Sequence, residues 1–349
     1  MSIHGVDALI VSPSPDLRYL SGYAALPLER LTALIVRAED DPVLMVPELE
    51  VAAARAAGVS FEITSWAETE DPFALIATLL SDADVIGVDD RMWASRLFAI
   101  QEALPETSLT VGGSIIAELR MTKEPEEVAA LTDAGAAIDR VHDRMHEWLR
   151  AGRTEREVGA DIARAILDEG HDQVDFVIVA SGPNGASPHH EVSDRVIEVG
   201  DPVVVDIGGT NKAGYCSDST RNYVAGPEVD PEYAALHAVL LDAQTAQRAA
   251  ARPGISAEQL DAVGRDIIEA AGFGPNFMHR TGHGIGLETH EEPYIVSGSV
   301  RMLKPGMAFS IEPGIYLPGR FGARIEDIFV CTDDGAVSLN NTSRELRFL

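Results

Sequence analysis

The sequence predicts two domains, a small α/β domain (residues 1–118) followed by a larger α+β domain (residues 119–349). Three observations support this division. The chain has 349 residues, about twice the length of one ordinary domain. Its first third alternates short apolar runs with helical patterns, which is typical of an α/β domain. Beyond Pro125 the order changes to helices first and strands later, which suits an α+β domain.

The predicted elements of the first domain follow one another closely. Short apolar runs predict strands at 8–11, 31–36, 42–46, 61–64 and 85–89. Helical spacing of apolar residues predicts helices at 47–58, 71–82 and 93–105.

The second domain begins with a long amphipathic helix that has Pro125 in its first turn, where the missing N–H costs nothing. Its apolar stripe consists of Val128, Leu131, Ala134, Ile138, Val141, Met145 and Trp148. Capping boxes begin two further helices, at Thr154/Glu157 and Ser256/Gln259. Strands are predicted at 174–180, 202–207, 220–225, 306–311 and 323–331.

Composition excludes several classes of protein. Against 27 Lys and Arg stand 56 Asp and Glu, a formal charge of −29, which repels nucleic acids and anionic membranes. Cys216 and Cys331 are too few for a disulfide framework or a thiolate zinc site. The amino terminus lacks the pattern of a signal peptide, and no apolar run is long enough to span a membrane, so we expect a cytoplasmic protein.

Several common catalytic motifs are absent from the sequence. It contains no GxGxxG at a strand–helix junction, no GxxxxGK[ST], no HExxH and no GxSxG. These absences leave dinucleotide binding, phosphoryl transfer, single-zinc proteolysis and serine acyl transfer without support.

Acidic and imidazole side chains gather instead where apolar strands meet glycines. Asp206 ends the strand VVVD, and a glycine-rich hairpin turn over 208–214 is expected to return Asp218 beside it. Two neighbouring carboxylates repel each other unless a proton or a cation lies between them. Taken alone, Asp206 is equally typical of a turn cap.

Three histidines, His279, His283 and His290, follow in MHRTGHGIGLETHEEP, where glycines leave His283 open to close approach. Each one alone is more typical of a hydrogen-bonded structural histidine. Glu312 ends another apolar strand, in SIEPG.

Arg324 and Glu326 share one strand face. Taken alone, they are equally typical of an ion pair. Together, four carboxylates and an imidazole at strand ends indicate a site for two divalent cations that could carry out metal-assisted hydrolysis.

The chain resembles the pita-bread metallopeptidases, the group of prolidase, aminopeptidase P and methionine aminopeptidase. The motifs VDIG, GYCSDSTRN, HRTGHGIGLETHEEP, SIEPGIY and RIED carry the resemblance. The segments PDLRYLSGY and ERLTALIV resemble the creatinase-like amino domain of the prolidase and aminopeptidase P branch. The resemblance therefore implies a pita-bread catalytic domain preceded by a creatinase/prolidase-like α/β domain.

The resemblance also implies roles for the metal ligands. Asp206 would bind one metal, Asp218 and Glu326 would bridge both, and His283 and Glu312 would complete the second. The implied ions are two per subunit, Mn²⁺ first, with Co²⁺ or Zn²⁺ as alternatives. Glu312 would also accept a proton from the attacking water.

Further residues are implied to act on the substrate. His290 would stabilise the tetrahedral intermediate, and His189 would bind substrate. His279 and Tyr316 would line the pocket, and Arg324 would orient Asp206.

The sequence departs from the family pattern at three places. The two aspartates are twelve residues apart instead of eleven, and His190 replaces a glycine, which would narrow the pocket mouth. Tyr294, which the resemblance implies is a substrate-binding residue, stands where many prolidases have the arginine that grips the carboxylate of the terminal proline. Dipeptide specificity would then need an arginine or lysine from the amino domain or from a dimer partner, or it is absent.

The implied function is an Xaa-Pro dipeptidase that hydrolyses the bond before proline with a water or hydroxide bridging two metals. The compact chain favours a dipeptidase over the alternative, an aminopeptidase P that acts on longer peptides. A metal-free creatinase-like hydrolase and a non-catalytic binding protein are remote alternatives. The implied partners are small peptides with proline second and a second copy of the chain in a homodimer.

Overall fold

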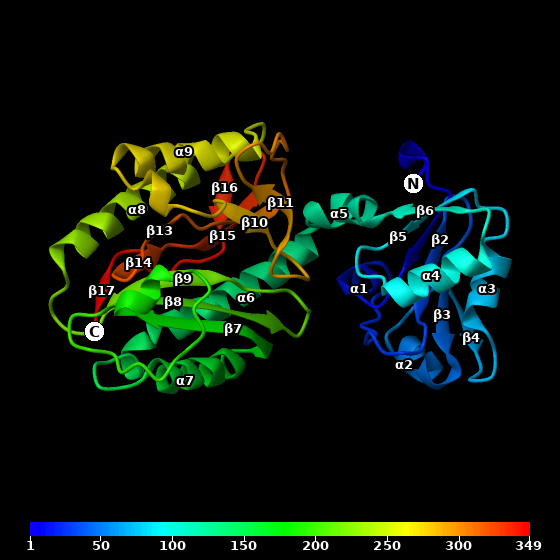
Figure 1. Cartoon of the computed structure of the whole chain (residues 1–349), viewed down its shortest axis with the longest axis horizontal. Coiled ribbons are helices and arrows are strands. Elements are labelled where there is room, and N and C mark those ends of the chain that lie inside the picture. The colour runs from blue at the N-terminus through cyan, green and yellow to red at the C-terminus, as the bar shows by residue number, and fades with distance from the viewer. The chain divides into compact units, whose positions relative to one another are not determined.

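A computed structural model describes residues 1–349, except for the side chain of Ser2. The chain forms two compact units, Met1–Arg120 and Met121–Leu349, which Figure 1 draws from blue to red along the chain. The boundary predicted after residue 118 falls inside helix α5 (Gly113–Met121).

The first unit is built on a six-stranded mixed sheet with the strand order β4-β3-β2-β1-β5-β6. Its strands are β1 (Ala8–Val11), β2 (Ala33–Arg37), β3 (Val43–Pro47), β4 (Glu62–Trp66), β5 (Val85–Val88) and β6 (Ser108–Val111). Its helices are α1 (Pro15–Ser21), α2 (Val51–Ala56), α3 (Pro72–Leu79), α4 (Ala94–Ala103) and α5.

Side chains that alternate along the strands pack into two hydrophobic cores, one on each face of the sheet. Ile10 and Ile35 pack with Ile76 of α3 and Ile100 of α4 on one face. On the opposite face, the core consists of Val6, Leu9, Val11, Leu17, Tyr23, Leu34, Leu44, Val46, Ala54 and Ile116, which include residues of α1, α2 and α5. Helices therefore cover both faces of the sheet (Figure 1), as expected of an α/β unit.

The second unit contains two main sheets and a hairpin. The sheets have the strand orders β17-β9-β8-β7 and β11-β10-β12-β15-β16, and β13 pairs with β14. The strands are β7 (His171–Ser181), β8 (Pro202–Asn211), β9 (Ser219–Val224), β10 (Gly282–Gly284), β11 (Glu291–Ile295), β12 (Ala308–Ile311), β13 (Gly314–Leu317), β14 (Phe321–Arg324), β15 (Asp327–Cys331), β16 (Ala336–Ser338) and β17 (Arg347–Phe348).

Two pairs of helices supply the outer layers of this unit. They are α6 (Pro125–Asp143) with α7 (Glu155–Asp168), and α8 (Pro231–Ala250) with α9 (Ala257–Ala270). Ile138 and Ile162 of the first pair pack on Val205 of β8. Leu260 of α9 packs with Phe309 and Phe329 of the other sheet. The strands therefore lie between the two helical layers, as Figure 1 shows.

Several sequence predictions need correction. Helix α6 ends at Asp143, so Met145 lies in a following 3₁₀ turn and Trp148 lies beyond that turn. The predicted strand 323–331 is two strands, because Glu326 N donates to Thr220 O at 3.2 Å and the chain changes partners there. The sequence analysis also missed the 20-residue helix α8. Both predicted capping boxes are confirmed.

Within the described part of the chain, every helix is too short or too polar to cross a membrane.

Candidate metal centre and substrate cavity

A cavity of about 1190 Å³ opens in the second unit. Its polar lining is dominated by titratable side chains. They are Arg156, Asp175, His189, His190, Glu191, Asp206, Asp218, His279, Arg280, His283, His290, Glu312, Arg324 and Glu326.

Asp206 and Asp218 come from the hairpin of β8 and β9. Asp206 pairs with Thr220 across the two strands, and Asp218 immediately precedes β9. The turn itself spans residues 211–214, with Gly214 N donating to Asn211 O at 2.8 Å, so the predicted turn over 208–214 is too long. Gly208 lies in β8, where any Cβ would collide with the ring of Phe176. The longer strand leaves both carboxylates facing the cavity.

His283 lies on β10 between two glycines that the fold requires. A Cβ on Gly282 would collide with the carbonyl of Ser310, and one on Gly284 with that of Glu292. The short strand therefore fits tightly between β11 and β12. His283 itself is buried, with an exposed fraction of 1%.

The imidazole of His283 is oriented by its own backbone. Nδ1 lies 3.0 Å from Gly284 O, and because a carbonyl can only accept, Nδ1 carries the proton. Nε2 then offers a lone pair toward Glu312 Oε1 at 3.1 Å, Asp218 Oδ2 at 3.6 Å and Glu326 Oε1 at 3.9 Å. A lone pair aimed at three carboxylates is the arrangement of a metal ligand, with the other nitrogen held by a carbonyl.

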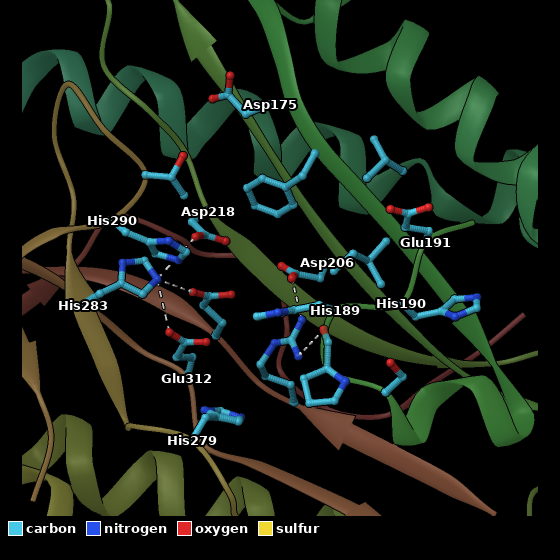
Figure 2. A pocket seen from close by; sticks show the side chains of 18 of the residues that line it. Asp175, His189, His190, Glu191, Asp206, Asp218, His279, His283, His290 and Glu312 are labelled. Carbon is cyan, nitrogen blue, oxygen red and sulfur yellow. Dashed lines mark hydrogen bonds and ion pairs between the residues drawn. The ribbon is translucent and has the colours of Figure 1, made fainter. Parts of the chain in front are cut away.

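Ligand atoms form three overlapping groups whose members lie within 4.8 Å of one another. The groups are Asp206, Asp218 and Glu326; His283, Glu312 and Glu326; and Asp218, His283 and His290. Figure 2 shows Asp206, Asp218, His283 and Glu312 directed toward a common region, with His290 beside His283. The sequence-predicted ligands therefore come together in space.

Glu326 has a buried carboxylate oxygen whose hydrogen-bonding capacity is not satisfied. Its exposed fraction is 1%, and within the described part of the chain its Oε1 has no hydrogen-bond partner. A buried carboxylate oxygen without a donor is costly. A bound cation would remove that cost.

The electrostatics of the cluster also favour a cation. Burial, and then the negative charges of Glu326, Asp206 and Glu312, raise the pKa of Asp218 well above its usual range. Burial and the charges of Glu312 and Asp206 likewise raise the pKa of Glu326. Burial alone would raise the pKa of Glu312, but its close contact with His283, followed by the influence of His279 and Arg324, lowers the pKa to about 2. Carboxylates that repel one another this strongly suit hard divalent cations.

A hydrogen-bonded chain supports the cluster from behind. Arg324 donates from Nη2 to Asp206, from Nε to Thr220 Oγ1 at 3.1 Å and from Nη1 to Tyr316 Oη at 2.8 Å. Thr220 Oγ1 lies 2.8 Å from both Asp206 Oδ1 and Glu326 Oε2. Sequence analysis missed Thr220, although it shares a strand face with Asp218.

His279 and Tyr316 belong to this support. His279 Nδ1 donates to Arg280 O at 2.7 Å, so its Nε2 accepts from Tyr316 Oη at 2.9 Å. The exposed fraction of Tyr316 is 0%, and it does not line the cavity. The prediction that Tyr316 lines the pocket is corrected: its hydroxyl lies behind the wall, between His279 and Arg324.

His290 and His189 lie at the open side of the cluster. The rings of His283 and His290 meet edge to face with centroids 4.1 Å apart. Partial desolvation of the ring against the cavity wall, followed by the proximity of His283 and the positive charge of Arg280, lowers the pKa of His290 to about 4. His290 is therefore neutral near pH 7. His189 is exposed on the cavity wall.

The loop that carries His189 is held by a residue that sequence analysis did not single out. Glu155, fully buried in the first turn of α7, accepts from Ser181 Oγ at 2.7 Å and Ser193 Oγ at 2.6 Å. It also contacts His190 Nε2 at 2.7 Å. His190 is thus fixed to the cavity wall by its partner carboxylate.

Tyr294, predicted to bind substrate, is not among the residues that line the cavity. It lies on β11, and its ring packs under the guanidinium of Arg280, 4.4 Å from the ring centroid. The predicted substrate contact of Tyr294 is therefore corrected, because the residue at this position of the cavity wall is Arg280 and not Tyr294.

These features define a hydrolase site of the carboxylate- and imidazole-ligated metal type. The orphaned oxygen of Glu326, the aimed lone pair of His283 and the all-oxygen-and-nitrogen donor set fit divalent ions.

Comparison with known proteins agrees. Residues 129–333 match metallopeptidase family M24, and residues 1–122 match the creatinase/prolidase N-terminal domain. The chain belongs to metallopeptidase family M24. The predicted fold class, a creatinase-like α/β domain and a pita-bread catalytic domain, is confirmed.

Individual relatives are similar over almost the whole chain. The probable dipeptidase PepE of Mycobacterium bovis is 51% identical, covering 98% of this chain and 92% of its own length. The Xaa-Pro dipeptidase of Lactobacillus helveticus is 36% identical, covering 98% and 95%. The crystal structure of dipeptidase PepE from Mycobacterium ulcerans has a TM-score of 0.93 at 50% identity, covering 99% and 94%.

Proposed function

We propose that the protein is an Xaa-Pro dipeptidase that hydrolyses the peptide bond before a terminal proline with two divalent metal ions, Mn²⁺ first. One observation carries the metal-dependent part. Overlapping groups of ligand atoms share Glu326, whose Oε1 has no hydrogen-bond partner in the described chain. The names of the relatives, dipeptidase and Xaa-Pro dipeptidase, support the substrate class.

The overlapping groups suggest how two ions would be held. Asp206, Asp218 and Glu326 would hold one, and His283, Glu312 and Glu326 the other. Asp218 also lies within reach of His283, so it too would be shared. Divalent ions of this kind polarise a carbonyl oxygen and lower the pKa of water.

The remaining residues would act directly on the substrate and on protons. Glu312 is ionised near pH 7, because its pKa is lowered to about 2, and it would accept a proton from the attacking water. His290 is neutral and would donate an N–H to the developing oxyanion. His189 would contact the substrate from the opposite wall, and Arg324 would hold Asp206 in place.

An aminopeptidase P that acts on longer peptides is the second candidate. The cavity of about 1190 Å³ exceeds the 300–1,000 Å³ typical of small-ligand sites, so its size leaves room for residues beyond proline. The full set of five ligand side chains argues against a metal-free creatinase-like hydrolase or a non-catalytic protein. A homodimer and a cytoplasmic location stay predictions from the resemblance, and light scattering would test the dimer.

Mass-spectrometric product analysis tests the proposal. Chelated protein reconstituted with Mn²⁺ is given Ala-Pro, Ala-Pro-Ala and the control Ala-Ala. Cleavage of Ala-Pro alone is expected. Cleavage of Ala-Pro-Ala with Ala-Pro intact would make the protein an aminopeptidase P. Cleavage of neither, with metal bound, would overturn the proline specificity and leave the metal centre in place.

A further inference from the structure

The cavity is lined by three arginines whose surroundings differ. Arg156 pairs with Asp194 at 2.7 Å, and Arg324 pairs with Asp206. Arg280 has no ion pair among the residues that the structure describes, although carboxylates outnumber arginines around the cavity. Its guanidinium is therefore the one cation of this lining, in the described chain, that no carboxylate neutralises.

Arg280 is held in place without using up its N–H groups. The face of Tyr294 supports the guanidinium at 4.4 Å from the ring centroid, a cation–π contact that leaves the edge of the guanidinium free. The backbone on either side of this residue is fixed as well. His279 Nδ1 donates to Arg280 O at 2.7 Å, and Arg265 Nη2 donates to His279 O at 2.9 Å.

The position of Arg280 relates it to the reacting groups. It lies close enough to His290 for its charge to contribute to the lowered pKa of that histidine. His290 in turn packs on His283, whose Nε2 faces the carboxylate cluster. Arg280 therefore lies on the side of the cavity that leads from the cluster past His290.

The chemistry of the substrate requires a cation in this region. In a dipeptide that ends in proline, the terminal carboxylate carbon is three bonds from the scissile carbonyl carbon, less than about 4 Å away. Two divalent ions would offset the four carboxylates that hold them, and these carboxylates offer the substrate carboxylate no hydrogen-bond donor. A carboxylate that leaves water for the cavity is costly unless a positive group pairs with it. Arginine suits this task, because its planar fork binds both carboxylate oxygens.

We propose that Arg280 binds the terminal carboxylate of the substrate and that Tyr294 positions its guanidinium. The assignment rests on the proposed dipeptidase function, and it makes Arg280 the determinant of specificity for dipeptides. The family resemblance alone predicted that such a cation would come from the amino domain or from a partner subunit. The structure offers it within the catalytic unit, fourteen positions before the tyrosine that replaces the family arginine.

Paired substrates test the assignment on Mn²⁺-loaded protein. For Arg280→Gln we expect KM for Ala-Pro to rise about 10- to 100-fold with kcat changed less than about threefold. The amide Ala-Pro-NH₂ lacks the carboxylate charge, so its kinetics should be the same in the variant and the unmodified enzyme. Arg280→Lys should recover part of the loss, since a lysine keeps the charge without the fork.

Two controls separate a specific contact from a general disturbance. Arg156→Gln removes another lining arginine, one already paired with Asp194, and should change neither substrate. Tyr294→Ala should raise KM for Ala-Pro several-fold and spare the amide, and Tyr294→Phe, which keeps the aromatic face, should raise it less than Tyr294→Ala does. Thermal melting of each variant checks that it is folded.

Two outcomes would overturn the assignment: an equal loss on Ala-Pro and its amide, or no loss on either. If the unmodified enzyme cleaves neither substrate, the proposed function fails, and calorimetry then decides the role of Arg280. Binding of L-proline and L-prolinamide would be compared in the unmodified protein and in Arg280→Gln. A loss confined to L-proline supports the carboxylate contact, and unchanged L-proline affinity rejects it.

Discussion

Glu326 and Asp327 are adjacent buried carboxylates that meet opposite environments. Asp327 Oδ1 accepts from Arg221 Nη2 at 2.6 Å, and its Oδ2 accepts from Gln244 Nε2 at 2.9 Å and from Arg344. Glu326 Oε2 has only the hydroxyl of Thr220, and its Oε1 has no hydrogen bond within the described chain. Both side chains are almost fully buried.

The different partners of these two carboxylates show that the protein neutralises the charge of Asp327 with its own side chains but not that of Glu326. Asp327 is compensated by two arginines, so its environment is complete when the chain folds. Burial, and then the negative charges of Glu312 and Asp206, raise the pKa of Glu326 instead of stabilising its ionised form. A carboxylate left in that state belongs to a site that is completed from outside, by a cation.

The largest effect is expected for Glu326→Gln. Because the amide lacks the negative charge that two ions would share, we expect turnover to fall by at least about 10³-fold and bound metal to decrease. The metal-free variant should melt no lower than the metal-free parent, since an uncompensated buried charge has been removed. Activity assays, metal analysis and thermal melting measure the three quantities. Unchanged turnover would remove Glu326 from the ligand set.

Asp327→Asn is the matched change on the other side of the comparison. It leaves Arg221 and Arg344 without their counter-ion in the interior, and removing one partner of a buried ion pair costs about 3–5 kcal/mol of unfolding free energy. Urea unfolding measures the loss. Bound metal and kcat of the protein that remains folded should stay within about threefold of the parent. A loss of metal with unchanged stability would contradict the comparison.

Sequence alone predicted that these carboxylates lie together, because strand ends and motif order place Asp206, Asp218 and Glu312 without knowledge of the packing. It predicted the surroundings of the cluster less well. The pairing of Thr220 with Glu326 depends on a bridge between two sheets, which alternation along one strand does not reveal. This bridge also divides the predicted strand 323–331 into β14 and β15.

The aromatic residues show a second limit of sequence patterns. Tyr294 and Tyr316 were placed in the pocket by their positions in the motifs, yet each lies behind a charged residue that reaches the wall. Tyr316 contacts Arg324, and Tyr294 supports Arg280. The direction of each side chain depends on contacts of β11 and β13 with neighbouring strands. A sequence motif therefore predicts the region in which a side chain lies but not the direction in which it points.

The smallest of the three effects is expected for His290→Ala, which tests where the ligand set ends. His290 lies with Asp218 and His283 in one group of possible ligand atoms, but it is exposed, whereas Glu326 and His283 are buried. Because His290 is exposed to the cavity and is not buried among the carboxylates, we expect it to act on the substrate and not to hold a metal ion. Its removal should then lower kcat by a factor on the order of 10².

Metal content separates the two roles of this histidine. His290→Ala should keep its metal, whereas His283→Ala should lose it, because Nε2 of His283 faces three carboxylates. His290→Asn retains an N–H donor and should recover part of kcat. Loss of metal from His290→Ala would extend the ligand set to this residue, and the oxyanion would then need a different donor, for which Arg280 on the cavity wall is a candidate.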